Sequence, residues 1–204
     1  MNWSIESWQD LLQRLNLSAD EIFFHELDGR YRSPNRYYHN TTHIENCLSL
    51  LNEFAHLADR KLLVEAAIWL HDAIYQSFSS KNELKSAELA AKMFGELGMN
   101  EEDAQVIYDL ILITAHREKP EGNDARLLVD IDLSILGADA AAYDVYERAI
   151  RKEYRFVPKR FYQPGRKKLL TSFIERPQLY CIPELRDRFE KQARENLKRA
   201  IERL

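Results

Sequence analysis

The side chains best suited to chemistry in this sequence are an adjacent histidine and aspartate, His71 and Asp72. They interrupt the apolar stretch AAIWLHDAIYQ at positions 66–76, whose pattern is typical of a buried helix. Burying an ionised carboxylate without a partner costs on the order of several kcal/mol. A metal ion would offset that cost, because coordination replaces the lost hydration of the carboxylate and occupies a lone pair of the imidazole. The doublet therefore indicates a candidate metal site.

Other segments offer further metal ligands, which a stable site requires because two protein ligands are too few. His39 and His43 lie before and at the start of one predicted helix, and His116 lies near the end of another. Asp130 and Asp132 share the apolar segment ARLLVDIDLSILGAD. Helical residues at this i, i+2 spacing point about 200° apart. We therefore expect one aspartate to face a shared centre and the other to cap a helix or meet solvent.

The elements that would position these residues are helices. Apolar residues recur at helical spacing from residue 4 to about 30, and Ser18 with Glu21 forms a capping-box pattern for a second helix. Thr42 with Glu45 repeats that pattern, which predicts a third helix with His43 at its start.

A fourth helix is predicted over 60–75, and its apolar residues cover all sides, which indicates a central helix. Asn82 is the predicted cap of the next helix, Gly98 its stop, and Asn100 the start of the helix that follows. Helical patterns continue to the C-terminus, without a convincing strand pattern or repeat. We expect an all-α protein.

Length and composition favour one domain over residues 1–204. The formal net charge of −4 gives no overall attraction to nucleic acid or to an anionic membrane, and no segment approaches about 18 uncharged apolar residues. Cys47 and Cys181 lack a CxxC spacing, which favours a reducing compartment. We expect a soluble, cytoplasmic protein with neither a membrane nor a nucleic acid as its partner.

The ordered set of motifs resembles a known family. The segments are YYHNTTHIENCL, AAIWLHDAIY, NELKSAELA, TAHR, DIDLSILG and RKEY. In this order they resemble the HD-domain superfamily of metal-dependent phosphohydrolases, and within it a group of uncharacterised bacterial predicted phosphohydrolases. The resemblance covers most of the chain. It implies an all-helical bundle with a core at about 36–140 and a C-terminal helical extension at about 141–204.

The resemblance also implies a set of metal ligands. It assigns the first histidine to His43, the doublet to His71 and Asp72, and the last aspartate to Asp132. Leucine follows Asp132 immediately, whereas the commoner family pattern has it two positions later, so Asp130 remains an alternative.

The mixed nitrogen and oxygen ligand set suits one divalent ion with open coordination positions, such as Mn²⁺, Mg²⁺, Fe²⁺, Ni²⁺, Co²⁺ or Zn²⁺. The cation lowers the pKa of a water molecule in an open position toward neutrality. The hydroxide that forms can attack phosphorus in a phosphomonoester or phosphoanhydride. We expect Asp72 to take part in catalysis. The resemblance places an acidic residue beside the site just beyond the doublet, and Glu83 is our candidate for proton transfer. The other interpretation of Glu83 is a favourable charge at a helix N-terminus.

A phosphorylated substrate needs positive charge, and residues 151–168 hold eight Lys or Arg against one Glu. Most of that stretch reads as a solvated helix face, but planar guanidinium groups can clamp phosphate oxygens. The candidate substrate-binding residues are Arg36, His39, His116, Arg151, Arg155 and Arg166, with Arg117 as a rival. The resemblance favours a small phosphorylated substrate of the nucleotide class.

Three other functions fit the same residues. The protein could be a catalytically silent metal- or nucleotide-sensing helical protein, or a metal-free interaction module in which hydrogen bonds alone hold His71 and Asp72. It could also be a relative of two-iron oxygenases, which would need further ligands such as His116. Without a metal role, His116 would be a cation near a helix C-terminus.

Overall fold

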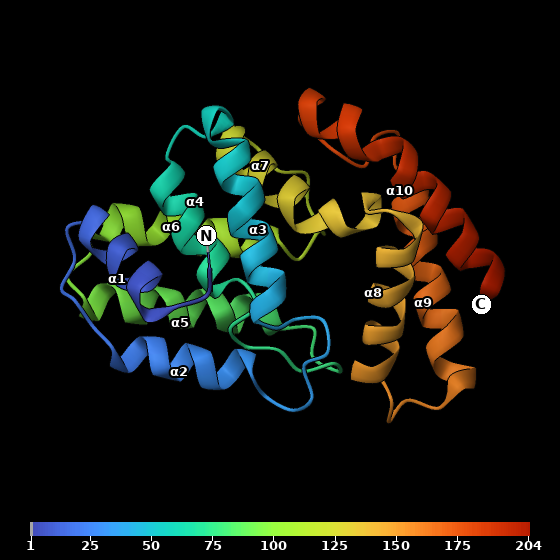
Figure 1. Cartoon of the computed structure of the whole chain (residues 1–204), viewed down its shortest axis with the longest axis horizontal. Helices are drawn as coiled ribbons and strands as arrows, with labels where there is room; N and C mark the ends of the chain where they lie inside the picture. The colour runs from blue at the N-terminus through green and yellow to red at the C-terminus, as the bar shows by residue number, and fades with distance from the viewer. Residues whose placement is uncertain (1) are drawn as a thin grey trace. The chain divides into compact units, whose positions relative to one another are not determined.

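The protein is all-helical, as its sequence predicts. The computed structural model describes residues 2–204, and over that range it contains ten α-helices, two short 3-10 helices and no strand (Figure 1). The elements are α1 (Ile5–Arg14), α2 (Ile22–Tyr31), α3 (Thr41–Glu53), η1 (Ala55–Leu57), α4 (Lys61–Leu70), α5 (Asn82–Glu96), α6 (Glu101–Ile113), α7 (Asn123–Asp132), η2 (Leu133–Gly137), α8 (Ala140–Glu153), α9 (Lys159–Ile174) and α10 (Pro183–Arg203). None of the helices within 2–204 has the length and apolar character to cross a bilayer.

The chain divides into two compact units, one ending at Val129 and the other running from Asp130 to Leu204. The division falls inside α7, which continues through it as one unbroken helix. The expected single domain with a core at 36–140 and an extension from 141 stays a prediction.

Helix α4 lies at the centre of the first unit, which confirms the expectation from its apolar sequence. Trp69 of α4 is fully buried, and its ring lies 4.6 Å from that of Trp3 and 5.4 Å from that of Trp8. Glu65 is equally buried, and two of its oxygens accept hydrogen bonds of 2.9 and 2.6 Å from the guanidinium of Arg14 in α1. Aromatic packing and this bidentate ion pair fix α4 beneath α1.

Two predicted helix starts shift to neighbouring residues. Asn40, rather than Thr42, caps α3, because its side chain accepts a hydrogen bond from the Thr42 amide. At α2 the side chain of Asp20, rather than Ser18, accepts from the Phe23 amide. The capping-box pattern, Ser or Thr three residues before Glu, does not by itself determine which residue caps the helix.

The fourth helix ends five residues earlier than predicted. It stops at Leu70, so His71 is the residue that closes it and Asp72 lies just beyond. The reason comes from distant parts of the chain. The Arg36 guanidinium donates hydrogen bonds of 2.6 and 2.7 Å to the carbonyl oxygens of Asp72 and Ala73. The Ile74 amide donates one of 3.0 Å to the Ser86 hydroxyl. The doublet therefore stands at a helix end, not in the middle of a helix.

The second unit packs α8, α9 and α10 with η2. Gly137 of η2 lies directly against α10, where an added Cβ atom would come within 2.6 Å of the Phe189 Cβ. The Asn196 side-chain amide donates hydrogen bonds of 2.9 and 2.8 Å to the carbonyl oxygens of Leu136 and Ala138. The segment that follows α7 is thus anchored to the last helix.

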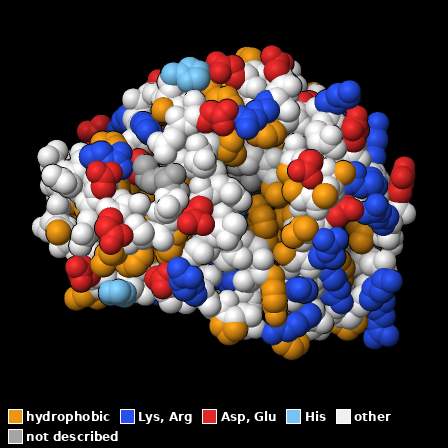
Figure 2. All heavy atoms as spheres, in the orientation of Figure 1, with side chains coloured by type: hydrophobic (Ala, Val, Ile, Leu, Met, Phe, Trp, Pro, Cys, Tyr) orange, Lys and Arg blue, Asp and Glu red, His pale blue; other side chains and the backbone are white. Residues whose placement is uncertain are grey.

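Charge is unevenly distributed along the chain. Residues 130–204 contain 17 Lys or Arg and 12 Asp or Glu, a formal charge of +5, whereas residues 1–129 contain 12 and 21, a formal charge of −9. On the face of the molecule drawn in Figure 2, Lys and Arg side chains gather over the part formed by α8–α10. The net charge of −4 therefore hides a basic C-terminal part.

Candidate metal centre

His71 is positioned by the last turn of α4. The residue is 2% exposed, and its ring Nδ1 lies 2.9 Å from the carbonyl oxygen of Ile68. A carbonyl oxygen can only accept, so Nδ1 carries the proton, and in the neutral ring Nε2 keeps its lone pair. A hydrogen bond from the far ring nitrogen to a backbone carbonyl is the usual way in which proteins orient a metal-binding histidine.

His43 faces this lone pair from the first turn of α3. It is 4% exposed, and its Nε2 lies 3.2 Å from the Nε2 of His71. The Asn40 cap fixes the start of α3 and thereby the direction of His43. The Tyr38 ring, 4.8 Å from the His43 ring, covers it.

Asp72 completes a set of three convergent ligand atoms. Its Oδ2 lies 3.3 Å from the Nε2 of His71 and 3.5 Å from the Nε2 of His43. Burial by itself would raise the pKa of Asp72. When the neighbouring imidazoles are protonated, their charges, that of His71 first, and the hydrogen bond that doubly protonated His71 then donates hold that pKa well below its ordinary value. Asp72 is therefore a carboxylate, as a ligand must be.

The spacing of the three atoms fits a common ion. Ligand atoms about 2.1 Å from one ion lie about 3.0 Å apart at right angles and about 3.4 Å apart at the tetrahedral angle. The distances here are 3.2, 3.3 and 3.5 Å. The donor set and its spacing therefore suit a first-row transition-metal ion.

Asp132 forms a second group with the two histidines. As the last residue of α7, it offers a carboxylate oxygen, and this oxygen and one ring nitrogen each of His43 and His71 all lie within 4.8 Å of one another. His43, His71 and Asp132 form a group able to hold a metal ion.

Asp130 neither caps its helix nor meets solvent, although one of these was expected of the second aspartate. It is fully buried, and its two carboxylate oxygens accept hydrogen bonds of 2.8 and 2.7 Å from the amides of Cys181 and Ile182, at the start of α10. Burial raises the pKa of Asp130 to about 6, and the two amide hydrogen bonds act against that rise. These contacts favour Asp132 over Asp130 as the last ligand.

Arg36 holds the backbone around the doublet. Besides the carbonyl oxygens of Asp72 and Ala73, it donates to that of His39 at 3.0 Å, and its guanidinium lies 5.0 Å from the centre of the Tyr31 ring. Its predicted role was substrate binding, whereas these contacts position the site. The sequence carries no signal for this role, because it depends on carbonyls that only the early end of α4 exposes.

His39 lies beside the ligand group. Its ring stacks on Tyr75 with centres 4.0 Å apart, and its centre lies 6.2 Å from that of the His43 ring. His39 is thus close enough to approach a molecule bound at the candidate centre.

Glu83 and Arg117 line a cavity of about 900 Å³ in the first unit, which has none of the four candidate ligands in its lining. Arg117 donates to the Ser80 carbonyl at 2.8 Å. His116, just before it, adopts a left-handed backbone with φ of 55°. Their predicted roles in proton transfer and substrate binding stay predictions.

The three arginines predicted from the basic stretch lie in the second unit. Arg166 is 8% exposed and donates to Glu147 and to the Tyr146 hydroxyl at 3.0 Å. Arg151 donates to the carbonyls of Tyr154 and Val157. Arg155 lies over the Phe156 ring, 4.4 Å from its centre. Their roles toward a substrate also stay predictions.

No protein-family model, curated protein or solved structure matches this chain. The chemistry of the site therefore has to be argued from its geometry.

Proposed function

We propose that this protein is a metal-dependent phosphohydrolase. The observation that carries the proposal is the convergence of His43 Nε2, His71 Nε2 and Asp72 Oδ2, with spacings of 3.2–3.5 Å that match the ligands of one ion. The motif order that resembles HD-domain phosphohydrolases supports the same chemistry, and Asp132 supplies the fourth ligand.

The chain's own residues would hold the reacting groups in place. The Ile68 carbonyl fixes the ring of His71, and Arg36 fixes the backbone that carries Asp72. Because these partners are in place before a ligand arrives, little reorganisation is needed on binding. When bound, a divalent ion supplies Lewis-acid catalysis and an acidified water molecule.

The substrate in this proposal is a phosphomonoester or phosphoanhydride, of the nucleotide class. Among the residues predicted to bind substrate, His39 has a ring whose centre lies 6.2 Å from that of the His43 ring. Asp72, whose pKa is lowered, remains ionised at neutral pH and can accept a hydrogen bond from a polarised water.

The test combines metal analysis with turnover. Purified protein is loaded with Mn²⁺, Mg²⁺, Fe²⁺, Co²⁺, Ni²⁺ or Zn²⁺ in turn and assayed for phosphate release from a nucleotide panel and from generic phosphate esters, with and without chelator. We expect turnover that chelator abolishes. His71→Ala and Asp72→Asn should lower it by at least about 100-fold, because each removes a metal ligand.

The exposed His25 provides the matched control, since His25→Ala makes the same change outside the site. Circular dichroism should show equal helix content in all variants. Turnover that survives chelator and His71→Ala would contradict the proposal. Tight nucleotide binding without turnover would favour a sensor, a metal-free protein would favour an interaction module, and two bound irons with strong ultraviolet absorption would favour an oxygenase.

A further inference from the structure

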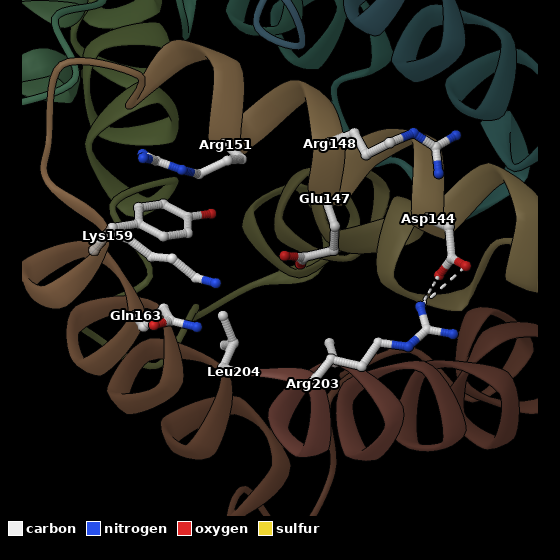
Figure 3. Close-up of a pocket in the computed structure, with 10 residues that line it drawn as sticks. Asp144, Glu147, Arg148, Arg151, Lys159, Gln163, Arg203 and Leu204 are labelled. Carbon is white, nitrogen blue, oxygen red and sulfur yellow. Dashed lines mark hydrogen bonds and ion pairs between the residues drawn. The ribbon is translucent and has the colours of Figure 1, made fainter.

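The second unit contains a cavity of about 330 Å³ between α8, α9 and the end of α10 (Figure 3). This volume falls in the range of small-molecule sites. The charged side chains that line it are Asp144, Glu147, Arg148, Arg151, Lys159 and Arg203. None of the four candidate metal ligands lines it, so an inference about this cavity does not depend on the proposed function.

The two acidic groups of the cavity already have cationic partners. Glu147 accepts hydrogen bonds of 2.5 Å from Arg166 and 2.9 Å from the Tyr143 hydroxyl. Asp144 accepts hydrogen bonds of 2.9 Å from Arg199 and 3.1 Å from Arg203 (Figure 3). These carboxylates therefore contribute little net negative charge to the cavity.

Three basic groups of the cavity lack such neutralisation. Within residues 2–204, no carboxylate lies within ion-pair distance of Arg148, Arg151 or Lys159. Arg151 donates only to backbone carbonyls and lies over the Tyr162 ring, 4.6 Å from its centre. Figure 3 shows the Lys159 side chain extending into the cavity from α9. The cavity thus carries an excess of positive charge.

Tyr162 adds an aromatic surface. The residue lines the cavity although it is only 8% exposed. Less than 1 Å² of its hydroxyl is accessible, so a molecule in the cavity meets the ring of Tyr162 rather than its hydroxyl.

We propose that this cavity binds a small organic phosphate, with Lys159 and Arg148 facing the phosphoryl oxygens and the Tyr162 ring contacting the organic portion. A phosphomonoester carries about −1.5 to −2 charges at neutral pH, which three unpaired cations can balance, whereas a carboxylate carries only −1. Ala200 and Leu204 give the lining an apolar part for the organic portion.

Isothermal titration of the full chain with phenyl phosphate, in buffer with chelator so that metal-dependent hydrolysis is prevented, tests this site. We expect a Kd at or below about 1 mM. Benzoate has the same ring with a carboxylate, and we expect it to bind at least about tenfold more weakly. Inorganic phosphate, which lacks the organic part, should also bind more weakly.

Three variants separate the cavity from the rest of the surface. Lys159→Ala should raise the Kd about tenfold, because it removes a donor to a charged group. Lys168→Ala, which removes the same charge from an exposed position of α9, should leave the Kd unchanged. His43→Ala, in the candidate metal centre, should also leave it unchanged.

The proposal is overturned by any of three results: no binding of phenyl phosphate, equal affinity for benzoate, or equal losses in Lys159→Ala and Lys168→Ala. Loss of binding in His43→Ala would place the ligand at the metal centre and would likewise overturn it. Because chelator is present throughout, failure of the phosphohydrolase proposal leaves this result unaffected, and the two remain distinguishable.

Discussion

Hydrogen bonds to backbone carbonyl groups help to hold His71 and Asp72 in place. His71 donates to the Ile68 carbonyl, and Arg36 binds the carbonyl oxygens of Asp72 and Ala73. A helix end leaves such carbonyls without partners inside the helix, and here a cation satisfies them. The arrangement aims two adjacent side chains at one point, which a continuing helix would spread about 100° apart.

Replacing Arg36 with lysine should weaken metal binding without unfolding the protein. Lysine keeps the charge but cannot hold three carbonyls with one planar group, so the backbone of Asp72 loses its anchor. We expect the metal Kd to rise about 10- to 100-fold, as for other residues that orient metal ligands. Competition against a fluorescent chelator measures this change.

Arg30→Lys is the matched control, because Arg30 only pairs with Glu26 on the surface of α2. An unchanged metal affinity in Arg36→Lys, or an equal loss in Arg30→Lys, would show that the carbonyl contacts do not position the site.

Helix α4 carries the doublet, and its packing against α1 depends on a buried ion pair. Glu65 has a side-chain exposure of 0%, and its partner Arg14 reaches it from α1. Breaking such a pair on one side leaves an uncompensated buried charge.

Arg14→Met should therefore lower the free energy of unfolding by about 3–5 kcal/mol, measured by urea denaturation. Arg30→Met, which breaks an exposed pair four residues apart, should cost no more than about 1 kcal/mol. Similar losses in the two variants would mean that the buried pair contributes no more than a surface pair.

Gly137 tests the contact between η2 and α10. An added Cβ would meet the Phe189 Cβ at 2.6 Å and its backbone oxygen at 2.7 Å, so Gly137→Ala should destabilise the protein by about 1–3 kcal/mol.

Gly29 lies inside α2 with nothing within 4 Å of the added atom, and Gly29→Ala should stabilise the protein by about 0.5–1 kcal/mol. Thermal unfolding followed by circular dichroism compares the two. Equal effects would contradict the close approach at Gly137.

Local signals predicted only some of the helix boundaries. Asn82, the expected cap of α5, is instead the first residue of that helix, and Lys81 stands at the cap without a side-chain hydrogen bond. Asn100 caps α6 as expected, accepting from the Asp103 amide, and Gly98 follows α5 with φ of 91°. The end of α4 could not be predicted in this way. It depends on Arg36, which approaches from 36 residues earlier, and an apolar sequence gives no sign of that contact.

The candidate centre could be predicted from the sequence because histidines and aspartates are chemically distinctive and occur here in an order that resembles HD-domain phosphohydrolases. That resemblance assigned His43, His71, Asp72 and Asp132. In the structure the ligand atoms of His43, His71 and Asp72 lie 3.2, 3.3 and 3.5 Å apart, and His43, His71 and Asp132 form a group able to hold a metal ion. The cavity around Tyr162 was not foreseen, although the basic stretch at 151–168 pointed to phosphate. A cavity of this kind becomes visible only when the three helices around it are placed.

A bound ion should stabilise the folded chain. Binding to the native state alone adds about 2.7 kcal/mol at a metal concentration 100 times the Kd. We expect the melting temperature to rise when Mn²⁺ or Zn²⁺ is added, to fall again with chelator, and not to respond in His71→Ala. A metal-dependent rise in His71→Ala equal to that of the parent would place the ion elsewhere.

The decisive measurement is the number of metal ions per chain after loading and desalting, determined by elemental analysis for the parent protein, His43→Ala, His71→Ala, Asp72→Asn, Asp132→Asn and His25→Ala. We expect about one ion in the parent and in His25→Ala, and a small fraction of one in the other four, because each loses a ligand. Equal metal content in all six proteins, or none in the parent under every loading condition, would refute the shared centre.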